Sequence, residues 1–152
     1  MNYVFVSPNF PFGYYKWARS LKERGVRVLG IGDTPYDNLL EECKEALDEY
    51  YYVPSLSDFQ SMVRAVVYYQ DKYGDIDYIE SNNEWWLMMD SRLREHFQVK
   101  NGFYPKDMMK IKSKSEMKAC FKAGGAKTMR YILVNGPDDL NKALSFACEV
   151  SY

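Results

Sequence analysis

Residues 3–35 read YVFVSPNFPFGYYKWARSLKERGVRVLGIGDTP, in which two short apolar runs flank a segment with helical spacing. We predict a strand over 3–6, because this run is rich in β-formers and the turn-forming residues that follow break it. The helical segment places four apolar residues on one face, namely Tyr14, Trp17, Ala18 and Leu21. Gly25 ends this helix, and 26–31 reads as a second strand. This order predicts a parallel strand pair with a right-handed crossover.

The same alternation continues to about residue 100. Further short strands are predicted at 51–53 and 77–80. An amphipathic helix precedes the first of them and is marked by Leu39, Leu40, Cys43 and Leu47. Residues 57–73 carry the clearest helical pattern, with Ser57 as the N-cap, and a helix follows over 84–96. The sequence therefore predicts an α/β fold with a doubly wound, Rossmann-like parallel sheet over roughly the first 100 residues.

The remaining residues follow a different pattern. Residues 105–124 read as one or two helices, 129–134 as a strand, and Gly136 opens a last helix. A single strand between helices cannot satisfy its edges, so we expect either that it joins the first sheet or that its partner strands are missing. We favour missing partners, and predict two domains, 1–104 and an incomplete 105–152, at the front of a longer protein.

Composition excludes several classes of function. The formal net charge of -1 and pI near 5.9 disfavour a polyanion binder, so we expect no nucleic-acid partner. Three widely spaced cysteines and one histidine predict no zinc site and no disulfide framework, which favours a cytoplasmic location. We find no signal peptide and no apolar run near the roughly 18 residues of a membrane span. A homodimer stays open.

The first strand-turn-helix lacks the GxGxxG pattern, which disfavours NAD. The carboxyl ends of parallel strands can still hold a ligand. The candidate lining residues are Ser7, Asn9, Asn82, Asn83 and Glu84, and the alternative for each is a cap or turn. Other polar and aromatic residues are interpreted as structural. Asp33 is predicted to cap a turn, and His96 to have a structural or surface role. Glu84, Asp90 and Glu95 are predicted to form a solvated helix face, and Trp85-Trp86 to pack the helix. We predict no catalytic and no metal-binding residue.

Lysines recur every four residues at 106, 110, 114, 118 and 122. On one helix they would form a cationic stripe, which is either a solvated face or a face toward an anion. A nucleic-acid patch is disfavoured, because arginine is absent there and no aromatic residue alternates with the lysines.

Several segments in a fixed order carry a family resemblance: residues 91–97 (SRLREHF) with Asn101-Gly102, then 114–118 (KSEMK), 123–127 (AGGAK) and 131–134 (YILV). With the Rossmann-like front unit, they resemble the pre-ATP-grasp region and first ATP-grasp helix of biotin carboxylases and carbamoyl phosphate synthase large subunits. Residues 126–129 depart from the family's apolar and proline run.

The resemblance implies an ATP-grasp ligase that activates a carboxylate or bicarbonate as an acyl phosphate, with ATP and Mg²⁺ as cofactors. It assigns the first ATP-contacting residue to Lys114, with Lys112 as the rival, and leaves Lys118 and Lys122 as solvated neighbours. Asn9, Asn82, Asn83 and Glu84 would form the wall for a small-molecule substrate. The magnesium ligands would lie outside this chain, so we expect the fragment alone to be inactive.

Two other functions stay open. A stand-alone α/β ligand-binding or regulatory module is the first, although Val53-Pro54 stands where a receiver domain would carry its phosphoacceptor aspartate. The second is a basic-helix nucleic-acid binder, whose affinity would fall steeply with salt.

Overall fold

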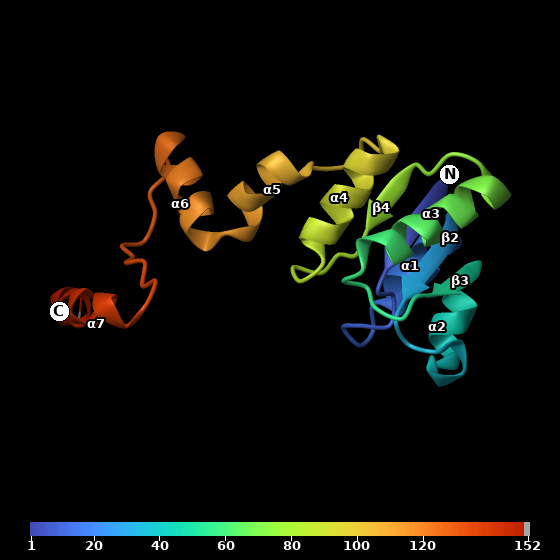
Figure 1. Cartoon of the computed structure of the whole chain (residues 1–152), viewed down its shortest axis with the longest axis horizontal. Coiled ribbons are helices and arrows are strands. Elements are labelled where there is room, and N and C mark those ends of the chain that lie inside the picture. The colour runs from blue at the N-terminus through green and yellow to red at the C-terminus, as the bar shows by residue number, and fades with distance from the viewer. Residues whose placement is uncertain (151–152) are drawn as a thin grey trace. The chain divides into compact units, whose positions relative to one another are not determined.

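The computed structural model describes residues 1–150, and the chain divides into two compact units, residues 1–108 and residues 109 onward. Residues 151 and 152, the end of the predicted second domain, lie outside the described residues. The division falls inside helix α5 (Pro105–Lys112) (Figure 1).

The first unit is built on one parallel sheet. Its strands are β1 (Asn2–Val6), β2 (Arg27–Gly32), β3 (Glu49–Tyr52) and β4 (Tyr78–Glu80). Their order in space is β3-β2-β1-β4, and every neighbouring pair is parallel. Its helices are α1 (Tyr15–Lys22), α2 (Glu41–Ala46), α3 (Phe59–Tyr73) and α4 (Leu87–Phe97), with a 3-10 turn at Tyr36–Asn38. The predicted α/β fold with a parallel sheet is confirmed.

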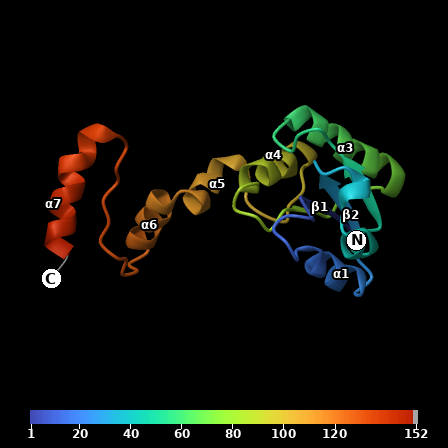
Figure 2. The ribbon, with the colours of Figure 1, turned by 90° about the horizontal axis from the view of Figure 1, so that it is seen from below.

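Helices cover both faces of this sheet, as Figure 2 shows for α1 on one side and α3 and α4 on the other. Side chains alternate along each strand, so Val4 and Leu29 pack toward α3 and α4 while Phe5 and Val28 pack toward α1 and α2. All four of these side chains are fully buried. The two hydrophobic clusters hold the sheet rigid and thereby fix where its strand ends lie.

Helix boundaries differ from the sequence prediction in several places. Asp58, and not Ser57, is the N-cap of α3, because its carboxylate accepts the backbone N–H of Gln60 at 3.1 Å. Helix α2 starts at Glu41, so Leu40 lies outside it and is exposed. Helix α4 starts at Leu87, three residues after the predicted start at 84. The position of Gly74 was predicted correctly: its φ of 84° ends α3.

Trp17 was predicted on one face of α1 with Tyr14, Ala18 and Leu21, but it is much less buried than Ala18. Its side chain is 58% exposed, while Ala18 is fully buried against the sheet. A small residue lets the α1 backbone approach the strands closely, and Trp17, one position earlier, is turned toward the helix's outer side.

The second unit contains the helices α6 (Lys114–Ala123) and α7 (Leu140–Val150), with a 3-10 turn at Pro137–Asp139. Ser113 separates α5 from α6, and its hydroxyl accepts the N–H of Glu116 as an N-cap. The strand predicted over 129–134 does not form. Within residues 109–150 no other strand forms that could pair with the N–H and C=O groups of this segment.

None of the helices within residues 1–150 has both the length and the apolar character needed to cross a membrane.

Glu49, at the start of β3, is the acceptor of a polar cluster on α3. The hydroxyls of Tyr68 and Tyr73 and the Lys72 ammonium donate to its carboxylate. Burial alone would raise the pKa of Glu49, but these donors outweigh it and lower the pKa below its usual value.

Glu49→Gln should therefore lower the free energy of unfolding by about 1 kcal/mol at pH 7, where the donors meet a neutral amide. A depressed pKa adds stability above the unfolded value, and that stability is lost as pH falls through the folded value. The difference between wild type and variant should thus be smaller at pH 3 than at pH 7. Urea denaturation at both pH values measures it, and an equal difference at the two would contradict the assignment.

Candidate functional site

The candidate site lies at the topological switch point of the sheet, where the order in which strands are added changes from one side of β1 to the other. From β1 the chain builds outward through β2 to β3, and β4 then lies on the other side of β1. In open parallel sheets, the carboxyl ends of the two strands at such a switch point are the usual place for a ligand. Here those strands are β1 and β4, which end at Val6 and Glu80.

Both strands are followed by backbone in the left-handed region. Ser7 has a φ of 57° directly after β1, and Asn82 has a φ of 55° two residues after β4. Such values are uncommon for residues other than glycine and are concentrated at functional sites. The Ser7 N–H donates to the carbonyl of Ile31 in β2 at 2.8 Å, which holds the turn on the strand end.

Asn9 joins the segment after β1 to the turn after β2. Its Nδ2 donates to the Thr34 hydroxyl at 2.9 Å. Its Oδ1 is buried and has no hydrogen-bond partner within the described residues. A buried acceptor without a donor is rare in folded proteins and suits a ligand or an ordered water that donates to it.

Asn82 and Asn83 form the matching segment after β4. The Tyr14 hydroxyl donates to the Asn82 carbonyl at 2.9 Å, which links this segment to the one after β1. Asn83 accepts the N–H of Trp85 at 3.0 Å through Oδ1, while its Nδ2 is buried without an acceptor within residues 1–150. Glu84 is exposed next to it.

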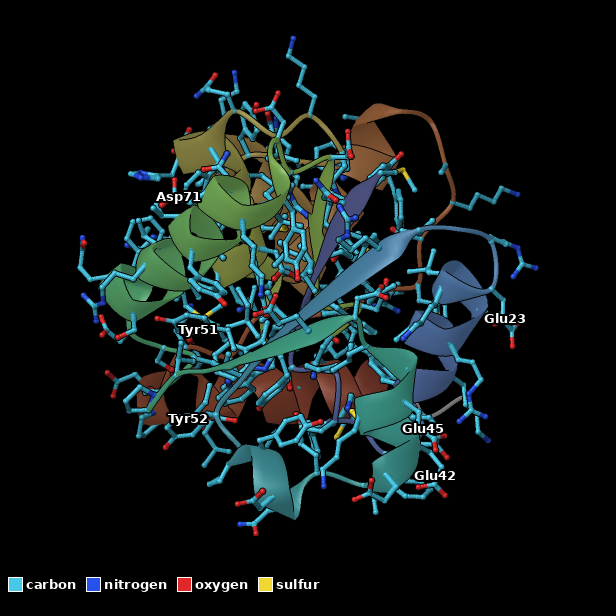
Figure 3. The ribbon with its side chains drawn as sticks, turned by 90° about the vertical axis from the view of Figure 1, so that its right-hand side faces the viewer. Glu23, Glu42, Glu45, Tyr51, Tyr52 and Asp71 are labelled. Atoms are coloured by element: carbon cyan, nitrogen blue, oxygen red, sulfur yellow. The ribbon has the colours of Figure 1, made fainter. Side chains whose placement is uncertain are left out.

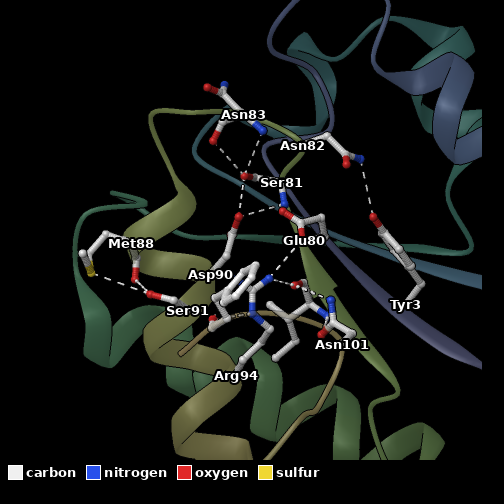
Figure 4. Close-up of polar contacts among 12 residues, drawn as sticks. Tyr3, Glu80, Ser81, Asn82, Asn83, Met88, Asp90, Ser91, Arg94 and Asn101 are labelled. Atoms are coloured by element: carbon white, nitrogen blue, oxygen red, sulfur yellow. Dashed lines mark hydrogen bonds and ion pairs between the residues drawn. The ribbon is translucent and has the colours of Figure 1, made fainter. Parts of the chain in front are cut away.

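A buried polar cluster supports the segment after β4 from below, as Figure 4 shows. Asp90 of α4 accepts both the N–H and the hydroxyl of Ser81 on its Oδ2, at 3.0 and 2.5 Å. Its Oδ1 has no partner within the described part of the chain. Burial raises the pKa of Asp90 well above its usual range, and the nearby Glu80 carboxylate raises it further.

Arg94, one turn after Asp90, joins three segments and is 2% exposed. Its Nη1 donates to the Ile79 carbonyl at 2.9 Å and to the Glu80 carboxylate at 3.0 Å. Its Nε and Nη2 both donate to the Phe103 carbonyl. A Cβ at Gly102 would lie 3.1 Å from the guanidinium carbon, so glycine there leaves room for Arg94. The outer edge of β4 is bonded by Asn101, which accepts the Ile79 N–H at 3.2 Å.

The structure brings four of the predicted lining residues, Ser7, Asn9, Asn82 and Asn83, to the carboxyl ends of β1 and β4. The alternative that the sequence allowed, a structural role in a turn, also holds for Ser7 and Asn83, because both make hydrogen bonds within their own turns. Both residues nevertheless lie at the carboxyl edge of the sheet. That they bind substrate stays a prediction. The solvated face predicted for Asp90 is wrong, because Asp90 is completely buried.

The sequence did not identify Asp90 and Arg94 as the residues that hold β4 and the segment after it in place. One signal was available: they are four residues apart, and Met89 and Leu93, which precede them, are also four apart and buried. Because Asp90 and Arg94 are adjacent to this apolar pair on α4, the same spacing indicates that the two charged side chains lie on or next to the buried face of the helix. Of the tryptophans, Trp86 packs on the core as predicted, but Trp85 is 74% exposed.

The lysines lie on two helices and not on one continuous stripe, because Ser113 interrupts the helical run. Lys112 is the last residue of α5, and Lys114 is the first of α6 and is exposed. Lys118 is not merely solvated: its ammonium lies 4.4 Å from the centre of the Tyr131 ring. Lys122 lines a hollow of about 530 Å³ together with Arg130, Tyr131 and Phe146 among others.

Within residues 1–150, no three His, Cys, Asp or Glu side chains are grouped as metal ligands.

Comparison with protein families and with curated proteins finds no match. Among solved structures, the chain is similar to the crystal structure of an L-amino acid ligase from Bacillus licheniformis, with a TM-score of 0.60 and 13% sequence identity. The alignment covers 97% of this chain and 42% of that one, so the chain spans less than half of that ligase's length. At this identity the likeness shows the fold alone.

Proposed function

We propose that this chain is the front portion of an ATP-dependent ligase and supplies the wall of its substrate site. Three observations support the proposal: the fold likeness to an L-amino acid ligase, the sequence resemblance to ATP-grasp enzymes, and the fraction of the ligase's length that the chain spans. The reaction would activate a carboxylate as an acyl phosphate and transfer the acyl group to an amine. Carbamoyl phosphate synthase or biotin carboxylase chemistry, with bicarbonate as the carboxylate, is the narrower alternative.

The observation that carries the proposal is the pair of unpartnered buried amide atoms at the switch point. Asn9 Oδ1 can only accept a hydrogen bond, and Asn83 Nδ2 can only donate one. A small molecule with both an amine and a carboxylate offers the complementary groups. Asn82 is held in the left-handed region by the segment around it, and Glu84 offers an exposed carboxylate beside the same turn.

Lys114 is the proposed contact to ATP. A lysine at the first position of an exposed helix can extend a mobile point charge toward a phosphate. When bound, ATP supplies the phosphoryl group, and magnesium offsets charge on the phosphates. The magnesium ligands would lie in other parts of the protein.

Lys114→Ala in the complete protein should weaken ATP binding roughly ten- to hundredfold, since a charge-assisted contact contributes about 1.5–3 kcal/mol. The matched control is Lys122→Ala, which removes the same charge from the same helix and should leave ATP affinity within about twofold. Calorimetric titration with ATP measures both. Equal effects of the two substitutions would show a general charge effect and remove Lys114 from the site.

The reaction itself is tested by ADP release from the complete protein with ATP and magnesium. The proposal expects release that depends on an added L-amino acid, whereas release with bicarbonate alone supports the narrower alternative. Asn9→Leu and Asn83→Leu should raise the KM for the amino acid and leave the KM for ATP unchanged. No ADP release with any carboxylate would contradict a ligase.

A stand-alone ligand-binding module is the second candidate, because the switch point and its asparagines lie entirely within residues 1–108. It predicts that the 152-residue chain binds an amino acid without ATP and that adding ATP leaves the affinity for the amino acid unchanged. The ligase proposal predicts that ATP and the amino acid raise each other's affinity in the complete protein.

A further inference from the structure

Two neighbouring helices on one face of the first unit carry opposite charge. Helices α1 and α2 lie side by side and share the cluster around Phe5 and Val28. Figure 3 shows them next to each other, with Glu42 and Glu45 pointing outward from α2. Residues 15–24 contain Lys16, Arg19, Lys22 and Arg24 against a single acid, Glu23. The α2 segment is acidic and carries Glu41, Glu42, Glu45 and Asp48 against Lys44.

Helix α1 also has a hollow beside its basic residues. Its volume is about 380 Å³, and it is lined by Lys16, Trp17, Ser20, Leu21 and Arg24. Trp17 is more than half exposed there, which is unusual for a tryptophan on a helix that already packs on a sheet. An exposed aromatic side chain with arginine nearby is typical of protein interfaces. On the α2 side, Tyr36 and Leu40 are exposed as well.

Contacts inside the chain neutralise only some of these charges. Lys22 is such a case on α1, since its ammonium lies 3.5 Å from Asp48 and donates to the carbonyls of Glu45 and Leu47. Lys44 pairs with Glu41 at 2.7 Å. Within residues 1–150, no ion pair of 4 Å or less engages Lys16, Arg19, Glu42 or Glu45. The outward charges are therefore available to a partner.

We propose that this face binds a second copy of the chain, with α1 of each copy on α2 of the other. A two-fold axis between the helices would bring the basic residues of α1 onto the acidic residues of the partner's α2 twice, as an isologous dimer requires. Trp17 would pack near the partner's Tyr36 and Leu40 at the centre. The inference rests on the charges and exposure of α1 and α2, and it does not depend on the proposed activity.

The test uses two variants with opposite defects. Lys16→Glu with Arg19→Glu makes α1 acidic, and Glu42→Lys with Glu45→Lys makes α2 basic. Each variant alone would face like charges at both contacts, so its dimer should dissociate at least about tenfold more readily. Mixed together, the two variants regain opposite charges at both contacts and should form a heterodimer. Circular dichroism checks that both fold.

Sedimentation equilibrium of the wild type and the variants measures these outcomes. The wild-type dimer should weaken between 0.1 and 1 M salt, as the Debye length falls from about 10 to about 3 Å. The control is Asp71→Lys on α3, which lies on the other face of the sheet, and this substitution should leave the dissociation constant of the dimer unchanged. A monomeric wild type, failure of the mixture to associate, or a dimer that instead depends on the exposed apolar residues 129–134 would each overturn the proposal.

Discussion

Arg94→Met is expected to lower the free energy of unfolding by about 3–5 kcal/mol, because removing one partner of a buried ion pair leaves the other groups uncompensated. Arg94 donates to the Glu80 carboxylate and to the carbonyls of Ile79 and Phe103, and it is almost completely buried. Its loss would remove this donor from all three acceptors where β4, α4 and the linker to α5 meet, and the Ile79 carbonyl would keep only the longer bond from Asn101 Nδ2, at 3.4 Å, among the described residues. Methionine matches the aliphatic length of arginine, so the loss should report on polar contacts and not on a cavity.

Arg92→Met is the matched control, since Arg92 lies on the same helix, is exposed and stacks over the Phe59 ring at 4.1 Å. We expect a cost of no more than about 1 kcal/mol there. Urea denaturation with tryptophan fluorescence measures both variants. If Arg94→Met costs no more than Arg92→Met, Arg94 does not hold the segment after β4. Adding Glu80→Gln to Arg94→Met should restore part of the lost stability, because it removes the uncompensated charge.

Asp90→Ala is expected to have the next largest effect, at roughly 1–3 kcal/mol, because it leaves the Ser81 N–H unpaired and leaves the Ser81 hydroxyl only the longer bond to the Asn83 carbonyl. Both donors bond to Asp90 Oδ2 in a completely buried environment. Because Ser81 directly precedes Asn82, the substitution should also loosen the segment after β4. Hydrogen exchange over residues 81–86 measures this loosening, and unchanged protection there would contradict the role of Asp90.

Asp90→Asn separates the hydrogen bonds from the charge, because asparagine keeps an acceptor for Ser81. Burial raises the pKa of Asp90 from 3.8 to about 7. An acid with a raised pKa adds stability below its unfolded value, and that contribution is lost as pH rises through the folded value. The wild type should therefore lose stability relative to Asp90→Asn between about pH 4 and pH 7. If the free energies of unfolding of the wild type and of Asp90→Asn changed equally with pH across this range, Asp90 would not titrate there.

The candidate site was only partly predictable. Strand-end residues are readable, because a strand is a local apolar run and its carboxyl end follows directly from where the run stops. Asn9, Asn82 and Asn83 could be proposed on that basis alone. Their unpartnered atoms could not, since whether Asn83 Nδ2 meets an acceptor depends on segments far away in the chain.

The sequence alone determined the alternation of strands and helices and the parallel sheet, because those follow from periodicity over a few residues and from the short connections between elements. Only the tertiary structure decided that Asp90 and Arg94 are buried, that Trp17 faces outward and that 129–134 forms no strand. In each of these cases the outcome depends on groups distant in sequence: the carbonyls of Ile79 and Phe103 for Arg94, the close approach of Ala18 to the sheet for Trp17, and a neighbouring strand for 129–134. Local pattern encodes which elements form, and the free energy of burying or pairing a particular side chain is set by whatever else the fold brings beside it.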